Sequence, residues 1–94
     1  MEIERELMPV VREYLEYRRR DCAEIDRLLV SGSMRCIQDL GHRMKGSGGS
    51  FGFDGISAIG ESLESAARDT DAEGVRAAAA RLEEYLARVS VAYI

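Results

Sequence analysis

The 94-residue sequence has few of the residues that build disulfide scaffolds, metal sites or membrane spans. Its two cysteines, Cys22 and Cys36, are too few for a disulfide framework. With one histidine and no CxxC pair they also cannot complete a zinc site, so we interpret both as small buried apolar residues. No apolar run approaches the ~20 residues that span a membrane, and the N-terminus lacks the basic and apolar stretches of a signal peptide. The sequence therefore predicts a cytoplasmic protein without a metal site or a membrane span.

The sequence also has fewer basic residues than acidic ones. The chain has 17 acidic and 13 basic residues, for a formal net charge of −4. Because binding to a phosphate backbone needs a basic surface, this balance argues against nucleic acid as the main partner. The only basic run, Arg18–Arg20, has acidic residues on both sides and is typical of a solvated helix face.

Helix-breaking residues are rare, with a single proline, and no useful stretch alternates with period two, so we expect no β-sheet. Four amphipathic segments predict helices over residues 9–31, 33–51, 54–69 and 71–92. Pro9 suits either the first position of the first helix or a kink after a short lead-in helix at residues 3–8. Short connections favour antiparallel neighbours. The predicted fold is an all-α, antiparallel up-down four-helix bundle that forms a single domain over residues 1–94.

Apolar residues recur at spacings of three and four in each segment and define the expected core. Arg18 interrupts the stripe of the first helix, although its long stem can lie along apolar neighbours. Ser33, Asp54 and Asp71 suit the N-caps of the later helices, and Gly52 suits a left-handed residue that ends the second. The expected core positions are Val11, Leu15, Cys22, Ile25, Leu29, Ile37, Leu40, Met44, Phe51, Phe53, Ile56, Ile59, Leu63, Ala66, Ala67, Val75, Ala79, Leu82, Leu86 and Val89.

His42, the only histidine, lies on the polar side of the second helix. At ~100° per residue, Ile37, Leu40 and Met44 cluster within about 60° of one another, and His42 falls roughly 160° from the centre of that stripe. This geometry excludes a core position and leaves either an ordinary surface histidine or a reactive one. The residues on its side of the helix are Arg35, Gln38, Lys45, Gly46 and Gly49.

Three glycines, Gly46, Gly48 and Gly49, follow within two turns of His42. Each costs ~1 kcal/mol relative to alanine inside a helix, and a total of ~2–3 kcal/mol is large for a small domain. Two interpretations follow. Either the helix ends at Lys45 and a flexible loop follows, or the helix continues and the glycines bare a face that a partner's backbone can approach closely.

The stretch from Gly41 to Ser47 reads Gly-His-Arg-Met-Lys-Gly-Ser, and it is followed by Phe51-Gly52-Phe53 and a Leu63-Glu64 pair. This pattern resembles the histidine phosphotransfer (HPt) family, whose signature is a histidine, a lysine three residues on, then Gly-Ser, then a glycine that closes the helix. The resemblance covers essentially the whole chain, including Tyr14–Asp21. Gly41 is a mild departure, since alanine is more usual before the histidine. We expect it to loosen the helix slightly without removing chemistry.

The resemblance implies a monomeric four-helix bundle that acts as a phosphocarrier in a two-component phosphorelay, without kinase activity of its own toward ATP. The histidine of such a module accepts a phosphoryl group from the aspartate of a response-regulator receiver domain or a hybrid histidine kinase, and passes it to another receiver. Magnesium is held by the receiver, so no cofactor is expected on this chain. Imidazole suits the role because its neutral, nucleophilic form is well populated near neutral pH.

In the family a Glu or Gln on the following helix orients the imidazole, and Glu64 occupies the matching position, 22 residues after His42. Helical geometry puts Glu64 at the edge of its helix's core stripe. We therefore expect its carboxylate about 2.6–3.2 Å from Nδ1 of His42, or joined to it through one water. Lys45 is expected to stabilise the phosphoryl group and Gly46 to let a receiver dock. The other expected partner contacts are Arg35, Gln38, Gly49 and Arg68, the last also a candidate to hold the phosphate.

Two rival interpretations are open on the sequence alone. The first is a helical interaction module that docks a signalling partner without chemistry; the intact His42, Lys45 and Gly46 favour phosphotransfer instead. The second is the dimerising phosphoacceptor region of a sensor kinase. That region usually has an acidic residue directly after its histidine and adjoins an ATP-binding domain, whereas Arg43 follows here and 94 residues leave no room for such a domain.

Overall fold

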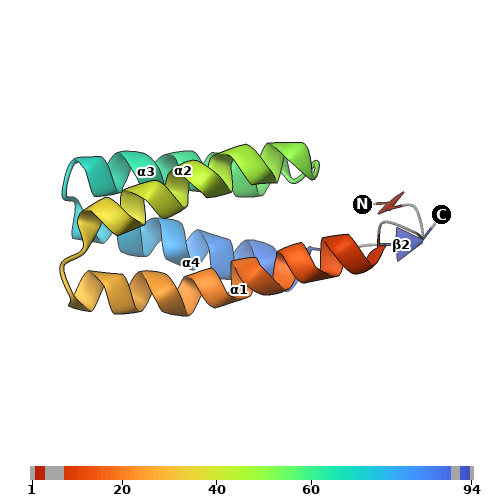
Figure 1. Cartoon of the computed structure of the whole chain (residues 1–94), viewed down its shortest axis with the longest axis horizontal. Helices are drawn as coiled ribbons and strands as arrows, with labels where there is room; N and C mark the ends of the chain where they lie inside the picture. Colours follow the sequence, from red (N-terminus) through yellow and green to blue (C-terminus); the bar gives the residue numbers. More distant parts are fainter. Residues whose placement is uncertain (1, 4–7, 90–91, 94) are drawn as a thin grey trace.

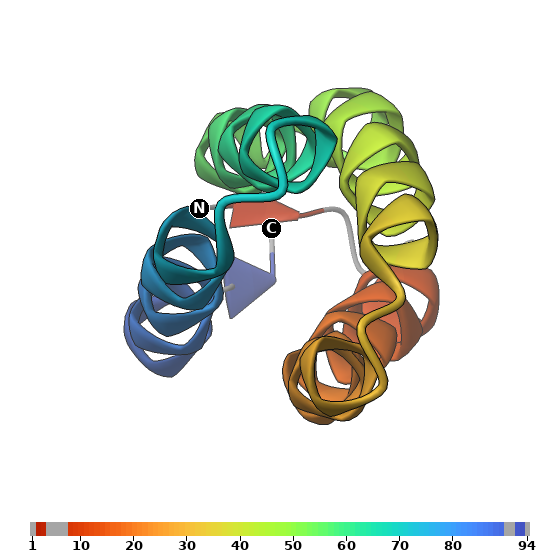
Figure 2. The ribbon, with the colours of Figure 1, turned by 90° about the vertical axis from the view of Figure 1, so that its left-hand side faces the viewer.

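Four helices make up the bundle in a computed structural model that describes residues 2–3, 8–89 and 92–93, with side chains described for residues 8–89. Consecutive helices run in opposite directions, and viewed end-on they occupy four corners around a shared interior (Figures 1 and 2). The predicted all-α, up-down four-helix bundle is confirmed. The helices are α1 (Met8–Val30), α2 (Met34–Ser50), α3 (Asp54–Arg68) and α4 (Ala72–Arg88).

A two-residue strand pair at one end of the bundle corrects the expectation of no strand pairing. β1 (Glu2–Ile3) pairs in parallel with β2 (Ala92–Tyr93). The fourth helix accordingly ends at Arg88 rather than at residue 92, and Val89 is already extended. Of the lead-in helix expected at residues 3–8, Ile3 lies in β1 instead, Met8 is the first residue of α1, and residues 4–7 lie outside the described residues. A pair this short is invisible to sequence periodicity, because two residues cannot establish an alternation.

The core lies where the four apolar stripes meet. Most of the expected core residues are buried, and the positions below 2% exposure come from all four helices and the turn after α2. On α1, Leu28 is buried whereas the expected Leu29 is only partly buried, because the stripe drifts around the helix over its length. None of the helices in residues 8–89 has the length and apolar character that a membrane span needs. The most deeply buried large side chains are Phe53, Ile25, Ile37, Met44, Ile56, Leu63, Leu82 and Val75.

The glycine-rich end of α2 is helical. The helix continues through Gly46, Gly48 and Gly49 to Ser50, so the alternative of a flexible loop after Lys45 is wrong. Gly52 then adopts φ 80°, the left-handed conformation expected of it, and the Phe53 N–H donates to the Gly48 carbonyl at 2.8 Å. This tight turn brings α3 back alongside α2.

The predicted helix caps are found at two of three positions. Asp71 caps α4, since its carboxylate accepts a hydrogen bond from the Gly74 N–H at 3.0 Å. Ser33 stands at the N-cap of α2, although its side chain makes no capping bond. The N-cap of α3 is Phe53 rather than Asp54, which is the first helical residue, where a carboxylate still interacts favourably with the helix dipole.

The two cysteines differ in exposure, which corrects the expectation that both are buried. Cys22 is buried and Cys36 is exposed. Burial raises the pKa of the Cys22 thiol to about 11. We expect iodoacetamide at about pH 8 to modify Cys36 and leave Cys22 unmodified in the folded protein, and to modify both after unfolding. Mass spectrometry of the alkylated protein measures this, and rapid native labelling of Cys22 would contradict the packing of α1.

Candidate functional site

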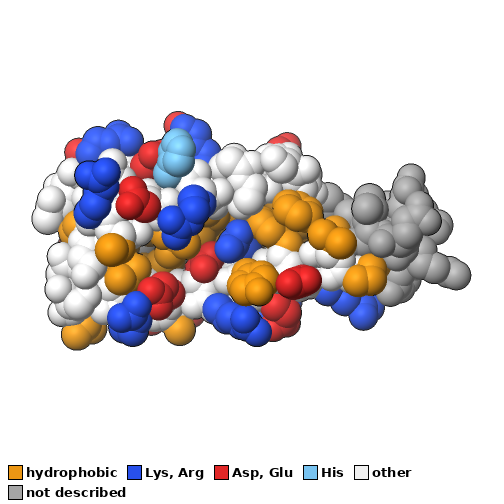
Figure 3. All heavy atoms as spheres, in the orientation of Figure 1, with side chains coloured by type: hydrophobic (Ala, Val, Ile, Leu, Met, Phe, Trp, Pro, Cys, Tyr) orange, Lys and Arg blue, Asp and Glu red, His pale blue; other side chains and the backbone are white. Residues whose placement is uncertain are grey.

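His42 stands on the outer face of α2. Its side chain is 72% exposed, whereas Ile37, Leu40 and Met44 on the opposite face are buried. Figure 3 shows the single histidine at the surface among Lys, Arg, Asp and Glu side chains. The predicted exposed position of His42 is therefore confirmed, and its ring is open to an approaching partner.

Glu64 of α3 hydrogen-bonds the His42 ring. Its Oε2 atom lies 2.9 Å from Nδ1 of His42, within the distance expected from the sequence. The Glu64 side chain is only 13% exposed, and its Oε2 also lies 3.8 Å from Nη2 of Arg68. Because a carboxylate can only accept, this contact selects the tautomer with the proton on Nδ1. The lone pair of Nε2 is then free on the opposite edge of the ring.

Lys45 lies one turn after His42 and leans toward α3. Its Nζ atom is 3.9 Å from Oε1 of Glu61, in a pair whose side chains are 45% and 69% exposed. Ion pairs this exposed contribute little to stability. The Lys45 backbone is held more firmly, since the Ser57 hydroxyl donates to the Lys45 carbonyl at 2.7 Å. Because its ion pair with Glu61 is weak, the Lys45 ammonium can leave Glu61 and pair with another anion near His42.

The surface of α2 beside His42 is bare at Gly46 and Gly49, which are both exposed. A Cβ atom on Gly46 would meet nothing within 4 Å, and one on Gly49 would reach only the Ser57 hydroxyl at 4.0 Å. Gly48, in contrast, is buried against α3. The bare face suggested by the sequence is therefore confined to Gly46 and Gly49.

The remaining expected partner residues lie along the same outer surface. Gln38 is half-buried one turn before His42, and Arg35 is exposed a further turn away, with Nε 3.4 Å from Oδ1 of Asp39. Arg68 is exposed on α3 and reaches the site only through Glu64. Within residues 8–89, no group of three or more His, Cys, Asp or Glu side chains is arranged to hold a metal ion.

Comparison with known families supplies a decisive match: residues 9–92 fit the family model of the Hpt domain. The chain belongs to the Hpt family. A comparison with curated proteins and with solved structures finds no significant match. Membership in the Hpt family implies phosphotransfer in two-component signalling, by a phosphocarrier module that lacks kinase activity and interacts with receiver or kinase partners.

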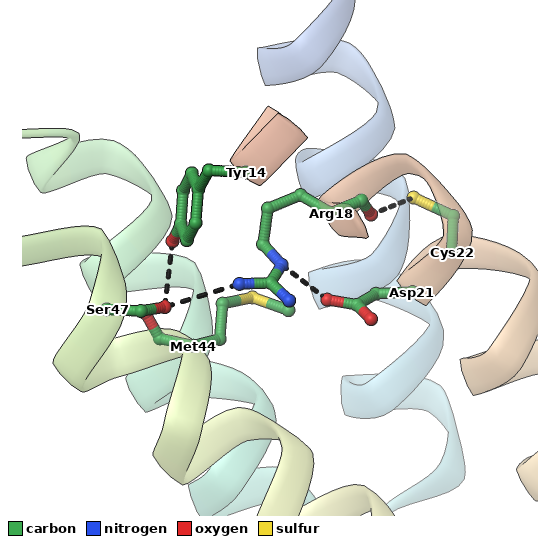
Figure 4. A network of polar contacts seen from close by, with 6 residues as sticks. All are labelled: Tyr14, Arg18, Asp21, Cys22, Met44 and Ser47. Carbon is green, nitrogen blue, oxygen red and sulfur yellow. Dashed lines mark hydrogen bonds and ion pairs between the residues drawn. The ribbon is translucent and has the colours of Figure 1, made fainter. Parts of the chain in front are cut away.

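A polar network joins α1 to α2 in this Hpt domain, and sequence patterns did not reveal it (Figure 4). The Tyr14 hydroxyl lies 2.9 Å from Oγ of Ser47, and Arg18 donates to the same oxygen at 3.3 Å. Arg18 also donates to Asp21 at 2.6 Å, and its guanidinium lies 4.7 Å from the centre of the Tyr14 ring. The sequence feature that could have indicated this network is Arg18, a charged residue at a core position, followed three residues later by the carboxylate of Asp21.

The Arg18–Asp21 pair is partly buried, with side chains 16% and 13% exposed. Burial raises the pKa of Asp21 above its usual value although the Arg18 charge lowers it, so the pair does not fully offset the loss of hydration. We infer that the network fixes how α1 meets α2 more than it adds stability.

Arg18→Ala should lower the free energy of unfolding by about 1–3 kcal/mol, because it leaves Asp21 partly buried without its partner. Urea denaturation measures the change. Arg19→Ala is the matched control: Arg19 pairs with Glu16 on the exposed side of α1, so its loss should cost at most about 0.5 kcal/mol. Equal effects of the two substitutions would contradict the buried role of Arg18.

Proposed function

We propose that His42 accepts a phosphoryl group on Nε2 from the aspartate of a receiver domain, and returns it to the aspartate of another receiver. The observation that supports this most is the 2.9 Å contact between His42 Nδ1 and Glu64. It leaves Nε2 unprotonated on a ring that is 72% exposed, which is what attack on a phosphorus atom in a partner protein requires.

The proposed step conserves atoms and charge. The Nε2 lone pair forms the new N–P bond while the P–O bond to the receiver aspartate breaks, and the bonding electrons leave with the aspartate as its carboxylate. The ring keeps its Nδ1 proton and becomes positively charged. The Glu64 carboxylate, which already accepts that proton in a hydrogen bond, stabilises the developing charge. The reverse step regenerates neutral His42.

Charge on the transferring phosphoryl group is balanced from both proteins. Lys45, one turn from His42, is proposed to turn from Glu61 toward the phosphoryl oxygens, and Arg68 adds a second positive charge beside Glu64. Magnesium is proposed to stay on the receiver. Transfer through a loose transition state depends mainly on positioning and charge stabilisation, so an exposed site on a rigid helix pair is sufficient.

The proposal is tested by incubating the chain with a panel of purified receiver domains charged with radiolabelled acetyl phosphate. We expect label on the wild-type chain that is stable in base and lost in acid, as for a phosphorus–nitrogen bond, and no label on His42→Gln. Binding of a receiver without any transfer of label would instead identify a non-catalytic interaction module.

Lys45→Ala should slow the transfer about 10-fold without unfolding the protein, since the side chain is half-exposed and its removal takes away one stabilising charge. Initial rates of label transfer and circular dichroism give the two measurements. Arg76→Ala, which removes an exposed cation from α4, is the control for net charge and should transfer at the wild-type rate. Equal rates for Lys45→Ala and the wild type would remove Lys45 from the mechanism.

A further inference from the structure

Three glycines lie along the contact between α2 and α3, and we refer to them as the glycine seam: Gly41 and Gly48 on α2, and Gly60 on α3. A Cβ atom built on Gly41 would lie 2.6 Å from the Glu64 backbone nitrogen and 2.8 Å from the Gly60 carbonyl oxygen. One on Gly60 would lie 2.5 Å from the Lys45 backbone nitrogen, and one on Gly48 would lie 2.6 Å from the Ser57 backbone nitrogen. The two helix backbones are therefore in direct contact along the seam.

The seam lies directly beneath the candidate site. Gly41, which precedes His42, faces the backbone of Glu64, and Gly60 faces the backbone of Lys45. Glu64 and Lys45, two of the four residues proposed to take part in the transfer, thus have their backbones against a glycine of the other helix. This corrects the expectation that Gly41 only loosens its helix, since its missing side chain is what admits the backbone of α3.

An alanine in the seam would separate the helices. Its Cβ would lie about 2.6 Å from a backbone nitrogen of the other helix, whereas ordinary van der Waals contact begins at 3.4 Å. The obstructing atoms belong to the backbone and cannot rotate away as a side chain could. The separation would therefore grow by roughly 0.8 Å. A displacement of that size takes the 2.9 Å contact between His42 and Glu64 beyond hydrogen-bonding distance.

We infer that Gly41 and Gly60 are positioning residues of the phosphotransfer site: they set the helix separation at which Glu64 reaches Nδ1 of His42 and fixes the ring tautomer. This inference rests on the proposed function for its effect on transfer, but its effect on the tautomer is independent of it. A surface glycine such as Gly46 has no such role, because nothing lies within 4 Å of the position of its Cβ.

The test uses the fact that His42 is the only histidine, so its ring nitrogens give a single set of NMR signals. At a pH where the ring is neutral, the wild type should show a protonated Nδ1 and an unprotonated Nε2. Gly60→Ala and Gly41→Ala should each raise the fraction with a protonated Nε2, because an imidazole without its acceptor can carry the proton on either nitrogen. Gly46→Ala should leave the tautomer unchanged and raise the melting temperature, as expected for an exposed helical glycine.

Transfer of label from the charged receiver panel gives the second measurement. Gly60→Ala should slow transfer as much as Glu64→Ala, and the double variant should be no slower than Glu64→Ala alone, because both changes remove the same contact.

Folded seam variants that keep the wild-type tautomer would overturn the inference. So would loss of folding in both Gly41→Ala and Gly60→Ala, which would make the seam a requirement of the fold alone. Absence of label on the wild type, with the tautomer shift still observed, would refute the proposed function and leave the seam's effect on the ring intact.

Discussion

Glu64→Ala should slow phosphorylation of His42 by about 10- to 100-fold, by analogy with the loss seen when a carboxylate that orients a metal-bound histidine is removed. Without the carboxylate the ring loses its fixed rotamer, the preference for an unprotonated Nε2, and the negative charge that stabilises the phosphorylated imidazolium. The fold should persist, because Glu64 is not part of the buried apolar core and the two side chains it contacts, His42 and Arg68, are both exposed. Initial rates of label transfer at saturating receiver measure the effect.

Glu64→Gln provides the matched comparison. Its amide oxygen can still accept the Nδ1 proton in a hydrogen bond, but it carries no charge, so transfer should be slowed less than in Glu64→Ala. Ser65→Ala, an exposed neighbour on α3, should transfer at the wild-type rate. If Glu64→Ala matched the wild type while remaining folded, the contact at 2.9 Å would have no part in the reaction.

Gly46→Gln should make the protein more stable and nevertheless reduce transfer by at least 10-fold. Glutamine gains about 0.5–1 kcal/mol over glycine inside a helix, and the space around Gly46 is open, so nothing within the bundle opposes the change. The added side chain lies one turn from His42, where the receiver must approach to bring its aspartyl phosphate to Nε2. The loss should therefore appear in receiver affinity, measured by calorimetry.

Ala77→Gln is the control for adding a glutamine to an exposed helical position, since Ala77 lies on α4, outside the proposed docking surface. It should bind the receiver and transfer label as the wild type does. Glu64→Ala should also bind normally, because it alters the ring and not the surface. A Gly46→Gln variant with wild-type affinity and rate would show that this part of α2 does not face the receiver.

The helices and the exposed face of His42 could be predicted because they depend on local periodicity. Stripes such as Ile37, Leu40 and Met44 determine which side of a helix is buried, and the opposite side follows from the geometry of a single turn. The Gly52 turn and the Asp71 cap were likewise predictable from the conformational preferences of one residue.

Contacts between helices were less accessible to sequence reasoning. In the sequence, Gly41 indicates only a helix weakened by one glycine. Its role depends on the facing Gly60, and no local sequence pattern links these two residues. Arg18 likewise reads as an interruption of an apolar stripe, because its hydrogen-bond partner Ser47 lies 29 residues away in the sequence. Glu64 was placed correctly because the family resemblance supplied the pairing with His42 that helical geometry alone left open.

Every group proposed to act on the phosphoryl group lies between His42 and Arg68, on two consecutive helices joined by the turn at Gly52. Contacts of such short sequence separation cost little loop entropy and form early relative to contacts between distant segments. The helices α1 and α4 supply apolar surface that keeps this hairpin folded. Sequence change in α1 and α4 should therefore alter mainly how long the folded state persists, whereas change within the hairpin alters the reaction itself.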